Sequence, residues 1–283
     1  MTYQTLFLKI EDQLKKAGCD SPSFDAVCLL EDIGKLPPQG LPPCDTREVE
    51  DARAAAVLSA AEKRAAGYPL QYILGDWAFL RLTLKVGEGV LIPRPDTELL
   101  CEVAAARLDA MEERPRVLDL CAGSGCVGLG VASLCRTAPA VTAVELSDAA
   151  LPYLKSNIAR YPQYAVEAVQ ADVLRDAARF DGAYAAILSN PPYIPTADLT
   201  GLMREVQHEP TIALDGAADG LLFYRAIANE WVPKLQSSGF CAVEVGIGQA
   251  ADVSALFTAA GLCDVTVYDD LGGVPRVVVG TKE

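Results

Sequence analysis

Residues 116–135, "RVLDLCAGSGCVGLGVASLC", contain a strand-like run, a glycine-rich loop and a helix-like run in immediate succession. The apolar run at 116–120 predicts a buried strand, and the run at 127–135 predicts a helix. Between them, Gly123 and Gly125 allow the backbone to turn sharply and to approach a ligand closely. The N-terminus of the following helix favours a negatively charged group. This stretch therefore predicts a strand–loop–helix unit that binds a ligand at its loop.

The alternation of strands and helices continues along the rest of the chain. Further strands are predicted at 140–146, 164–172, 183–188 and 239–246, and helices at 94–108, 147–161, 219–235 and 249–261. Residues 263–280 predict two more strands around the turn Gly272-Gly273. Repeated units of this kind build a mainly parallel sheet with helices on both faces, and the terminal pair adds an antiparallel edge. We therefore expect a doubly wound α/β fold with seven strands.

The first 74 residues predict helices instead. Leu6, Ile10 and Leu14 stand near helical spacing, and Gly18 supplies a C-terminal stop. Two more helices are predicted at 21–34 and 46–67, on either side of a proline- and glycine-rich connector. Few side chains of catalytic type occur here, so we expect residues 1–74 to form a helical domain that recognises the substrate.

A short linking β-hairpin is predicted at 75–93, before a catalytic domain at 94–283. Its apolar residues alternate at Leu80, Leu82, Leu84 and Val86, and "GEG" at 87–89 supplies the turn signal.

Composition excludes several classes of protein. Acidic residues outnumber basic ones by 38 to 24, and the net charge of −14 disfavours a nucleic-acid partner. His208 is the only histidine, and the nine cysteines include no CxxC pair, so no metal site is expected. The cysteines are expected to be reduced and buried. No apolar run is long enough to span a membrane, and a cytoplasmic protein is expected.

Acidic residues end two of the predicted strands. Glu145 closes the strand at 140–146, where a carboxylate can accept both hydroxyl protons of a ribose. Asp172 closes the next strand, within reach of an adenine amino group. Together with the glycine loop, these strand ends predict a pocket for a nucleoside cofactor.

Residues 123–128 also fit the G-x-G-x-x-G pattern of dinucleotide-binding proteins. Two features argue against a nicotinamide cofactor. No tyrosine is followed by a lysine four residues later, and the lone His208 lies in a segment flanked by proline.

The sequence "SNPPY" at 189–193 follows the fourth predicted strand and decides between these cofactors. A residue before proline is held extended, so Asn190 and the carbonyl of Pro191 have little freedom. The Asn190 side-chain oxygen and the Pro191 carbonyl can together accept two N–H bonds, which suits a planar NH₂ group. Tyr193 offers an aromatic face to stack on that plane.

The glycine loop, Glu145, Asp172 and Asn190-Pro191-Pro192-Tyr193 resemble the S-adenosylmethionine-dependent amino-methyltransferases. The stretches "PLQYILG" (69–75), "GVLIPRPDTELL" (89–100) and "REVQHEPTIALDGAADGLLFYRAI" (204–227) are similar to the HemK-type protein-glutamine methyltransferases. The similarity covers about residues 68–280, and the helical N-terminal domain fits the same family.

This resemblance implies a Rossmann-like methyltransferase that methylates the glutamine of the Gly-Gly-Gln motif in class I peptide chain release factors. No stretch of the sequence resembles an obligate dimer helix, so a monomer is expected. It assigns the methyl donor, S-adenosylmethionine, to Cys121, Ala122, Gly123, Ser124, Gly125, Glu145, Asp172, Val173 and Asn190. It assigns the substrate glutamine to Asn190, Pro191, Pro192 and Tyr193, with Asn190, Pro191 and Tyr193 as catalytic residues.

The chain departs from the family pattern at two positions. Cys121 stands where the family loop usually begins with glycine, and its side chain must point away from the cofactor or narrow the pocket. Val173 stands where an aromatic residue is common, and it would cover an adenine less fully. The roles of Glu244, Arg94 and Glu98 are left open by the sequence.

The sulfonium donor is already an activated electrophile, so the expected task of the enzyme is placement of the amide nitrogen. Hydrogen bonds to Asn190 and the Pro191 carbonyl also favour the positive charge that develops on that nitrogen. Three alternatives remain open at this point: a glutamine methyltransferase acting on a ribosomal protein, a DNA adenine methyltransferase, and a cofactor-binding regulator without catalysis.

Overall fold

The computed structural model describes residues 1–37, 40, 42–111 and 114–283. The chain divides into two compact units. The first comprises residues 1–76 together with 203–208, and the second comprises residues 77–202 and 209–283. The short segment 203–208 lies inside the range expected for the catalytic domain, but the structure groups it with the helical unit.

The first unit is helical. Leu6, Ile10 and Leu14 are fully buried along one side of its first helix, and Gly18 follows that helix with a φ of +77°. The helices are α1 (Tyr3–Lys16), α2 (Pro22–Asp32), α3 (Asp51–Ala65) and α4 (Leu70–Leu74), with a short 3₁₀ turn at Pro42–Cys44.

A buried arginine ties the segment 203–208 to this helical unit. Arg64 of α3 is only 8% exposed. Its Nε donates to Asp25 Oδ2 at 2.7 Å, and its Nη1 donates to Glu205 Oε1 at 2.7 Å. Two carboxylates therefore accept from one buried guanidinium, and removal of either leaves part of its N–H groups without an acceptor.

The second unit is built on a seven-stranded sheet in the order β5-β4-β3-β6-β7-β9-β8. The first five of these strands run parallel, and β9 pairs antiparallel with both β7 and β8. The predicted doubly wound, mainly parallel sheet with an antiparallel edge is thus confirmed. The strands are β3 (Arg116–Leu120), β4 (Ala140–Glu145), β5 (Val166–Gln170), β6 (Tyr184–Ser189), β7 (Leu235–Glu244), β8 (Leu262–Asp269) and β9 (Pro275–Lys282).

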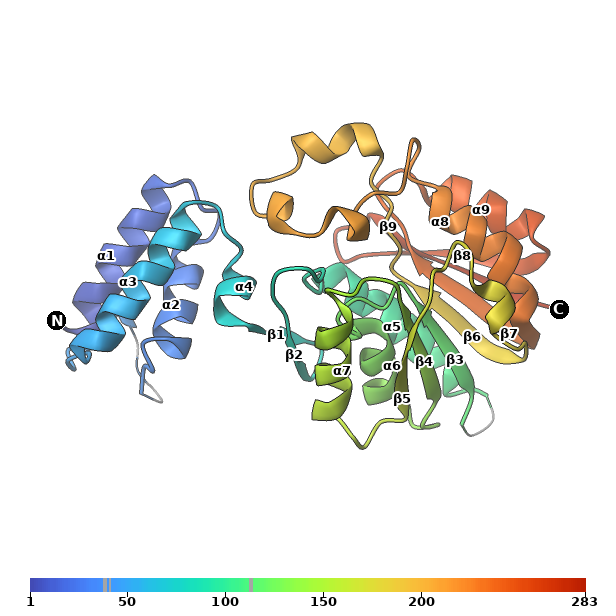
Figure 1. Ribbon diagram of the computed structural model, residues 1–283, viewed down its shortest axis with the longest axis horizontal. Coiled ribbons are helices and arrows are strands. Elements are labelled where there is room, and N and C mark those ends of the chain that lie inside the picture. The colour runs from blue at the N-terminus through green and yellow to red at the C-terminus, as the bar shows by residue number, and fades with distance from the viewer. Residues whose placement is uncertain (38–39, 41, 112–113) are drawn as a thin grey trace. The chain divides into compact units, whose positions relative to one another are not determined.

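Helices cover both faces of this sheet (Figure 1). On one face lie α5 (Pro95–Leu108), α6 (Cys126–Leu134) and α7 (Leu151–Arg160); on the other lie α8 (Leu222–Ala226), which continues as a π-helical turn at Ile227–Trp231, and α9 (Ala250–Ala259).

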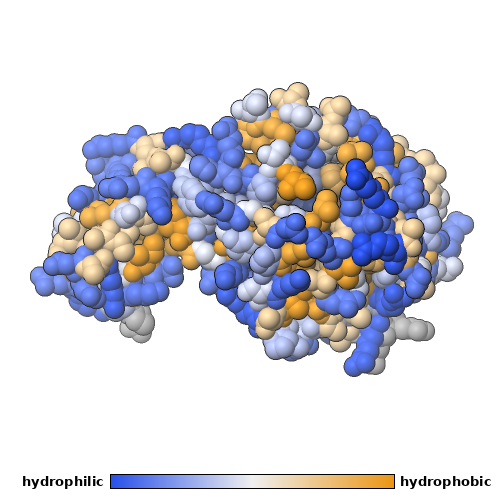
Figure 2. All heavy atoms as spheres, in the orientation of Figure 1, coloured by the Kyte–Doolittle hydropathy of each residue, from blue (hydrophilic) through white to orange (hydrophobic). Residues whose placement is uncertain are grey.

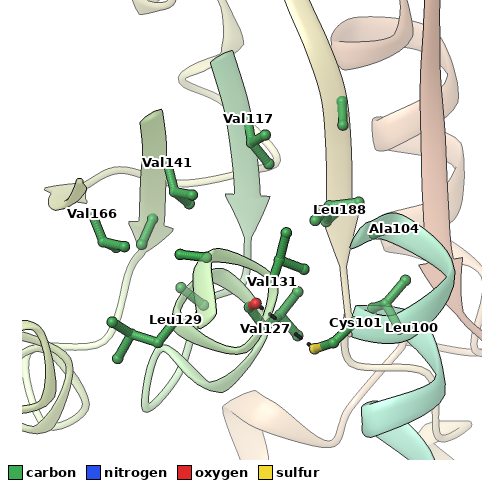
Figure 3. Packing of buried hydrophobic residues seen from close by; sticks show 14 of the residues in the cluster. Leu100, Cys101, Ala104, Val117, Val127, Leu129, Val131, Val141, Val166 and Leu188 are labelled. Atoms are coloured by element: carbon green, nitrogen blue, oxygen red, sulfur yellow. Dashed lines mark hydrogen bonds between the residues drawn. The ribbon is translucent and has the colours of Figure 1, made fainter. Parts of the chain in front are cut away.

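Successive strand residues alternate between two hydrophobic clusters. Val117 packs with α5 and α6, for example, whereas Leu118 packs with α8 and α9. Figure 3 shows the first cluster, in which Val117, Val141 and Val166 of three neighbouring strands face the side chains of α6. A strand buried on both sides has to be apolar at every position, which explains the continuous runs in the sequence.

The hairpin differs from its prediction. It consists of β1 (Asp76–Phe79) and β2 (Leu82–Lys85), and the chain reverses at Leu80–Arg81, where Leu80 has a φ of +51°. The prediction that "GEG" forms the turn was wrong. Those residues follow β2 instead, and Gly89 contributes to the pocket described below.

Other expectations meet the structure with mixed results. All nine cysteines carry free thiols, but the expectation of burial holds only for Cys19, Cys101 and Cys241. Cys44 is exposed, and the other five are partly exposed. No helix in the described part of the chain is long and apolar enough to cross a membrane. Over the described residues, no three His, Cys, Asp or Glu side chains come together as metal ligands would. The face in view in Figure 2 is largely hydrophilic, with hydrophobic residues gathered in separate patches.

Candidate functional site

A cavity of about 250 Å³ lies in the second unit, at the carboxyl ends of β3, β4 and β6. The chain order reverses between β3 and β6, and such a switch point opens a crevice at the end of a parallel sheet. Most residues predicted to bind the cofactor line this cavity: Cys121, Ala122, Gly123, Ser124, Glu145, Asp172, Val173 and Asn190. Pro192 lines it as well, whereas Gly125, Pro191 and Tyr193 are not among the described lining residues.

The glycine loop takes left-handed backbone conformations at three positions. Cys121, Gly123 and Gly125 have φ values of 60°, 55° and 83°. A Cβ on Gly125 would meet Leu154 Cδ1 at 2.7 Å, so the leucine side chain would have to shift, and the positive φ also favours glycine there. At Gly123 the nearest such contact is 4.0 Å, so only its φ favours glycine. Cys121 adopts a similar φ at the usual cost of a side chain in this region.

Glu145 fastens this loop to the end of β4. Its Oε2 accepts the N–H of Gly123 at 2.7 Å, and its Oε1 accepts the N–H of Ser147 at 2.7 Å. Burial raises the pKa of Glu145, and these backbone hydrogen bonds oppose that shift. Each carboxylate oxygen can accept more than one hydrogen bond, so Glu145 can still accept hydrogen bonds from the hydroxyl groups of a ligand in the cavity.

Asp172 and Val173 form the wall beside β5. Asp172 Oδ1 accepts the N–H of Leu174 at 2.8 Å, so this carboxylate stabilises its own turn as well as lining the cavity. Val173 is buried, and its carbonyl accepts a hydrogen bond from Trp231 Nε1 at 2.9 Å. The indole thus fixes the backbone that carries Asp172 into the cavity wall.

Asn190 follows β6 directly and enters the cavity wall at the opposite end. Its Nδ2 donates to Thr97 Oγ1 at 3.0 Å. Thr97 donates in turn to Glu244 Oε2 at 2.6 Å. Because the amide nitrogen of Asn190 is engaged in this way, the amide oxygen is the atom that can accept an N–H from a substrate.

Tyr193 is oriented toward Glu244. Its hydroxyl donates to Glu244 Oε1 at 3.5 Å, and its carbonyl accepts from Gln249 Nε2 at 2.9 Å. Burial is the main cause of its raised pKa. A Cβ placed on Gly246 would come within 3.0 Å of the tyrosine ring, which shows how closely the ring packs there.

Sequence reasoning missed the segments that cover the cavity from two sides. One is 89–94, and the other is 210–213 with Phe223. Glu209 joins them, because its Oε2 accepts the N–H of Ile92 at 2.9 Å and its Oε1 pairs with Arg94. Arg94 therefore does line the cavity, whereas Glu98 accepts the N–H of Leu80 at 2.7 Å and supports the hairpin.

Two further acids are buried close to the site. Asp119 of β3, for which the sequence suggested no role, accepts the N–H of Gly128 through Oδ2 at 2.8 Å, and its buried Oδ1 has no hydrogen-bond partner among the described residues. Burial raises the pKa of Asp119 to about 7. Glu244 is 2% exposed, and burial likewise raises its pKa to about 7. Their strand positions were visible in the sequence, but their partners were not.

Comparison with known proteins agrees with this geometry. The family model described as PrmC N-terminal domain matches residues 5–75, and the model described as Conserved hypothetical protein 95 matches residues 73–220. The release factor glutamine methyltransferase of Geobacter sulfurreducens is 38% identical, over 94% of this chain and 92% of its own length. The protein of the same name from Fusobacterium nucleatum is 33% identical, over 98% of this chain and 78% of its own.

A solved structure supports the fold independently. The catalytic domain of hMettl16, crystallised with MAT2A 3′UTR hairpin 1, superposes with a TM-score of 0.59 over 93% of both chains at 15% identity. At this identity the likeness concerns the fold alone. The long matches with the curated relatives place the chain more narrowly: it belongs to the family of release factor glutamine methyltransferases.

Proposed function

We propose that this protein transfers a methyl group from S-adenosylmethionine to the side-chain amide nitrogen of the glutamine in the Gly-Gly-Gln motif of class I release factors. The observation that carries the proposal is the arrangement of one cavity. A glycine loop and Glu145 lie at one end, and Asn190 stands at the other with its amide oxygen left as an acceptor.

The residues present fit an adenosine-containing donor. Glu145 offers a carboxylate at the end of β4, the loop at 121–124 gives close backbone approach, and Val173 adds an apolar wall. When bound, S-adenosylmethionine would supply a methyl group already activated by a sulfonium. The chain must then orient the acceptor and exclude water.

We assign the acceptor site to residues 190–193. The Asn190 oxygen and the Pro191 carbonyl accept the two N–H groups of the glutamine amide, which fixes its nitrogen for in-line attack. These same acceptors favour the positive charge that grows on the nitrogen during transfer. No dedicated base is required before transfer, because the proton is lost from a nitrogen that has become cationic.

The remaining features of the proposal concern the setting of the reaction. We also propose that the enzyme acts as a monomer, because no stretch of the sequence resembles an obligate dimer helix. The net charge of −14 supports a protein substrate without direct contact to nucleic acid. A release factor acts in translation, so the proposed site of action is the cytoplasm.

The test is incubation with radiolabelled S-adenosylmethionine and four acceptors: a class I release factor, its Gln→Ala variant in the Gly-Gly-Gln motif, ribosomal proteins and DNA. We expect label on the intact release factor alone, and mass spectrometry should place it on the glutamine. Label on ribosomal protein or DNA with none on the release factor would overturn the proposal, as would cofactor binding without any transfer.

A further inference from the structure

The site contains a hydrogen-bonded chain that extends from Asn190 into the protein interior. Asn190 donates to Thr97, Thr97 donates to Glu244, and Tyr193 donates to the second oxygen of Glu244. Thr97 is fully buried and Glu244 is 2% exposed, so water does not compete for these bonds. We call these three residues, Asn190, Thr97 and Glu244, the amide relay.

Three elements of the fold bring the relay together. In the parallel pair β6–β7, Ser189 lies opposite Val243, so Asn190 and Glu244 are the next residues along their two strands. Thr97 comes from the first turn of α5, where its N–H is bonded to the Arg94 carbonyl at 3.1 Å. A segment 93 positions earlier in the chain thus supplies the link between neighbouring strand ends.

The relay has only one direction while Glu244 is ionised. A carboxylate can accept hydrogen bonds but cannot donate them. The single proton of the Thr97 hydroxyl is therefore committed to Glu244, and Thr97 Oγ1 can only accept from Asn190. Asn190 must turn its NH₂ group toward Thr97, which leaves its oxygen on the other side of the amide.

That orientation decides whether a substrate amide can bind. An asparagine amide rotated by half a turn has nearly the same shape, but it would present N–H groups to the N–H groups of a glutamine. Two donors cannot form a hydrogen bond, so the rotated amide would repel the acceptor that the site has to hold.

We propose that Thr97 and Glu244 are positioning residues for methyl transfer, which hold Asn190 in the amide orientation that accepts the substrate N–H. This inference rests on the proposed function, because it concerns the same acceptor site. Neither residue needs to touch the reacting atoms.

The surroundings of Glu244 make the relay sensitive to pH. A protonated Glu244 can donate to Thr97 Oγ1, which frees the threonine proton for the Asn190 oxygen and permits the rotated amide. Burial raises the pKa of Glu244 to about 7, and the Thr97 bond, Arg276 and Tyr193 oppose the shift. The charged or titratable groups near it are Asp96 and Cys101 of α5, Cys126 of α6, Tyr193, Tyr224 of α8 and Arg276 of β9.

The experiment measures kcat/KM for release-factor methylation from pH 5.5 to about 9, a range that spans both protonation states of Glu244. In the wild type we expect kcat/KM to rise through a midpoint near the Glu244 pKa of about 7.

Thr97→Val should lower kcat/KM on the order of 30-fold, because a buried charge-assisted relay is lost. Thr97→Ser should restore it to within about 3-fold, because the hydroxyl returns. Glu244→Gln should lower it and abolish the acid limb.

The chain provides a matched control pair. Thr142 of β4 donates to Glu167 of β5 at 3.0 Å, in the same hydroxyl–carboxylate arrangement but exposed and outside the cavity lining. Thr142→Val and Glu167→Gln should leave both the rate and its pH profile unchanged. Cofactor affinity and thermal unfolding, measured on every variant, separate a positioning effect from a loss of fold.

A spectroscopic measurement tests the relay without relying on turnover. The side-chain amide resonances of Asn190, identified by their absence in Asn190→Asp, should shift with a midpoint near pH 7 in the wild type and not in Glu244→Gln. Resonances that do not titrate, or a Thr97→Val enzyme as active as Thr97→Ser, would overturn the positioning role while release-factor methylation stands. A wild type that never methylates glutamine would instead overturn the proposed function and this role together.

Discussion

The ends of β4 and β7 each carry a glutamate, and the two glutamates have different partners. Glu145 accepts two backbone N–H groups, from Gly123 and Ser147, and lines the cavity. Glu244 accepts two hydroxyl groups, from Thr97 and Tyr193, and is buried behind the cavity wall. Both have raised pKa values because both are desolvated. The chemistry of each glutamate is thus set by its donors rather than by its place at a strand end.

This difference divides the site into two parts. Glu145 fixes the backbone of a loop, and backbone donors have no rotational freedom to lose. Glu244 fixes a side chain through another side chain, and each hydroxyl in that path can reorient. We expect the Glu145 part to govern cofactor affinity, and the Glu244 part to govern turnover and its dependence on pH.

The largest effect is expected at the end of the second part. Asn190→Ala removes the acceptor for the substrate amide, and kcat should fall on the order of 10³-fold. The Kd of S-adenosylmethionine should stay within about 3-fold, because the contacts of the cofactor at Glu145 and the loop are retained. Single-turnover transfer measures the rate, and calorimetry measures the Kd of the cofactor. A near-normal kcat would contradict the assignment of turnover to the Glu244 part of the site.

Glu145→Gln should produce the opposite pattern. A glutamine amide has one oxygen in place of the two carboxylate oxygens, so it cannot accept from Gly123 and Ser147 with a separate oxygen for each. It also offers one acceptor atom fewer to a ribose. The Kd of the cofactor should rise about 10- to 100-fold, while kcat at saturating cofactor falls less. Calorimetric titration checks the affinity. Equal losses in Kd and kcat would mean that both glutamates serve the same step.

Asp119 extends the comparison to an acid that, among the described residues, accepts from one backbone N–H and from no hydroxyl group. Its pKa is raised above the unfolded value, so the folded state retains a proton that the unfolded chain releases. The stabilisation from this group is full below pH 4 and is lost as pH rises through about 7. The free energy of unfolding should therefore fall between about pH 4 and pH 7, and Asp119→Asn should show a smaller fall in urea titrations.

The smallest effect is expected in the loop that Glu145 holds. Gly123→Ala places a Cβ in open space but at a φ of +55°, so it should cost about 1 kcal/mol in the free energy of unfolding. Gly201→Ala is the control, because that glycine has open space and no positive φ. Thermal unfolding compares them, and equal midpoints would show that the loop relaxes freely.

The sequence predicted the parts of the fold that depend on local pattern. Continuous apolar runs indicated the buried strands, and the strand ends brought Glu145, Asp172 and Asn190 to one edge of the sheet. The pattern at 80–86 identified the hairpin but not its turn. Leu80 adopts a left-handed φ, and a leucine does not predict that conformation.

Contacts between segments far apart in the chain could not be predicted from local sequence patterns. Thr97 lies in the family-like stretch 89–100, but its role depends on the register of β6 and β7, which no spacing near residue 97 reveals. Glu209 was equally hidden, since it joins residues 92 and 94 to the segment after it. The role proposed for Glu244 depends on the identity of its two hydroxyl donors, which the sequence does not show.

The grouping of residues 203–208 with the helical unit limits how this protein can be dissected. A fragment that ends at Asp76 omits Glu205 and would leave Arg64 with only one of its two acidic partners. Transplanting the N-terminal helices onto another catalytic scaffold would meet the same deficit. The boundary between the units crosses the polypeptide three times, so a truncation meant to isolate the helices has to supply this short peptide as a separate insertion.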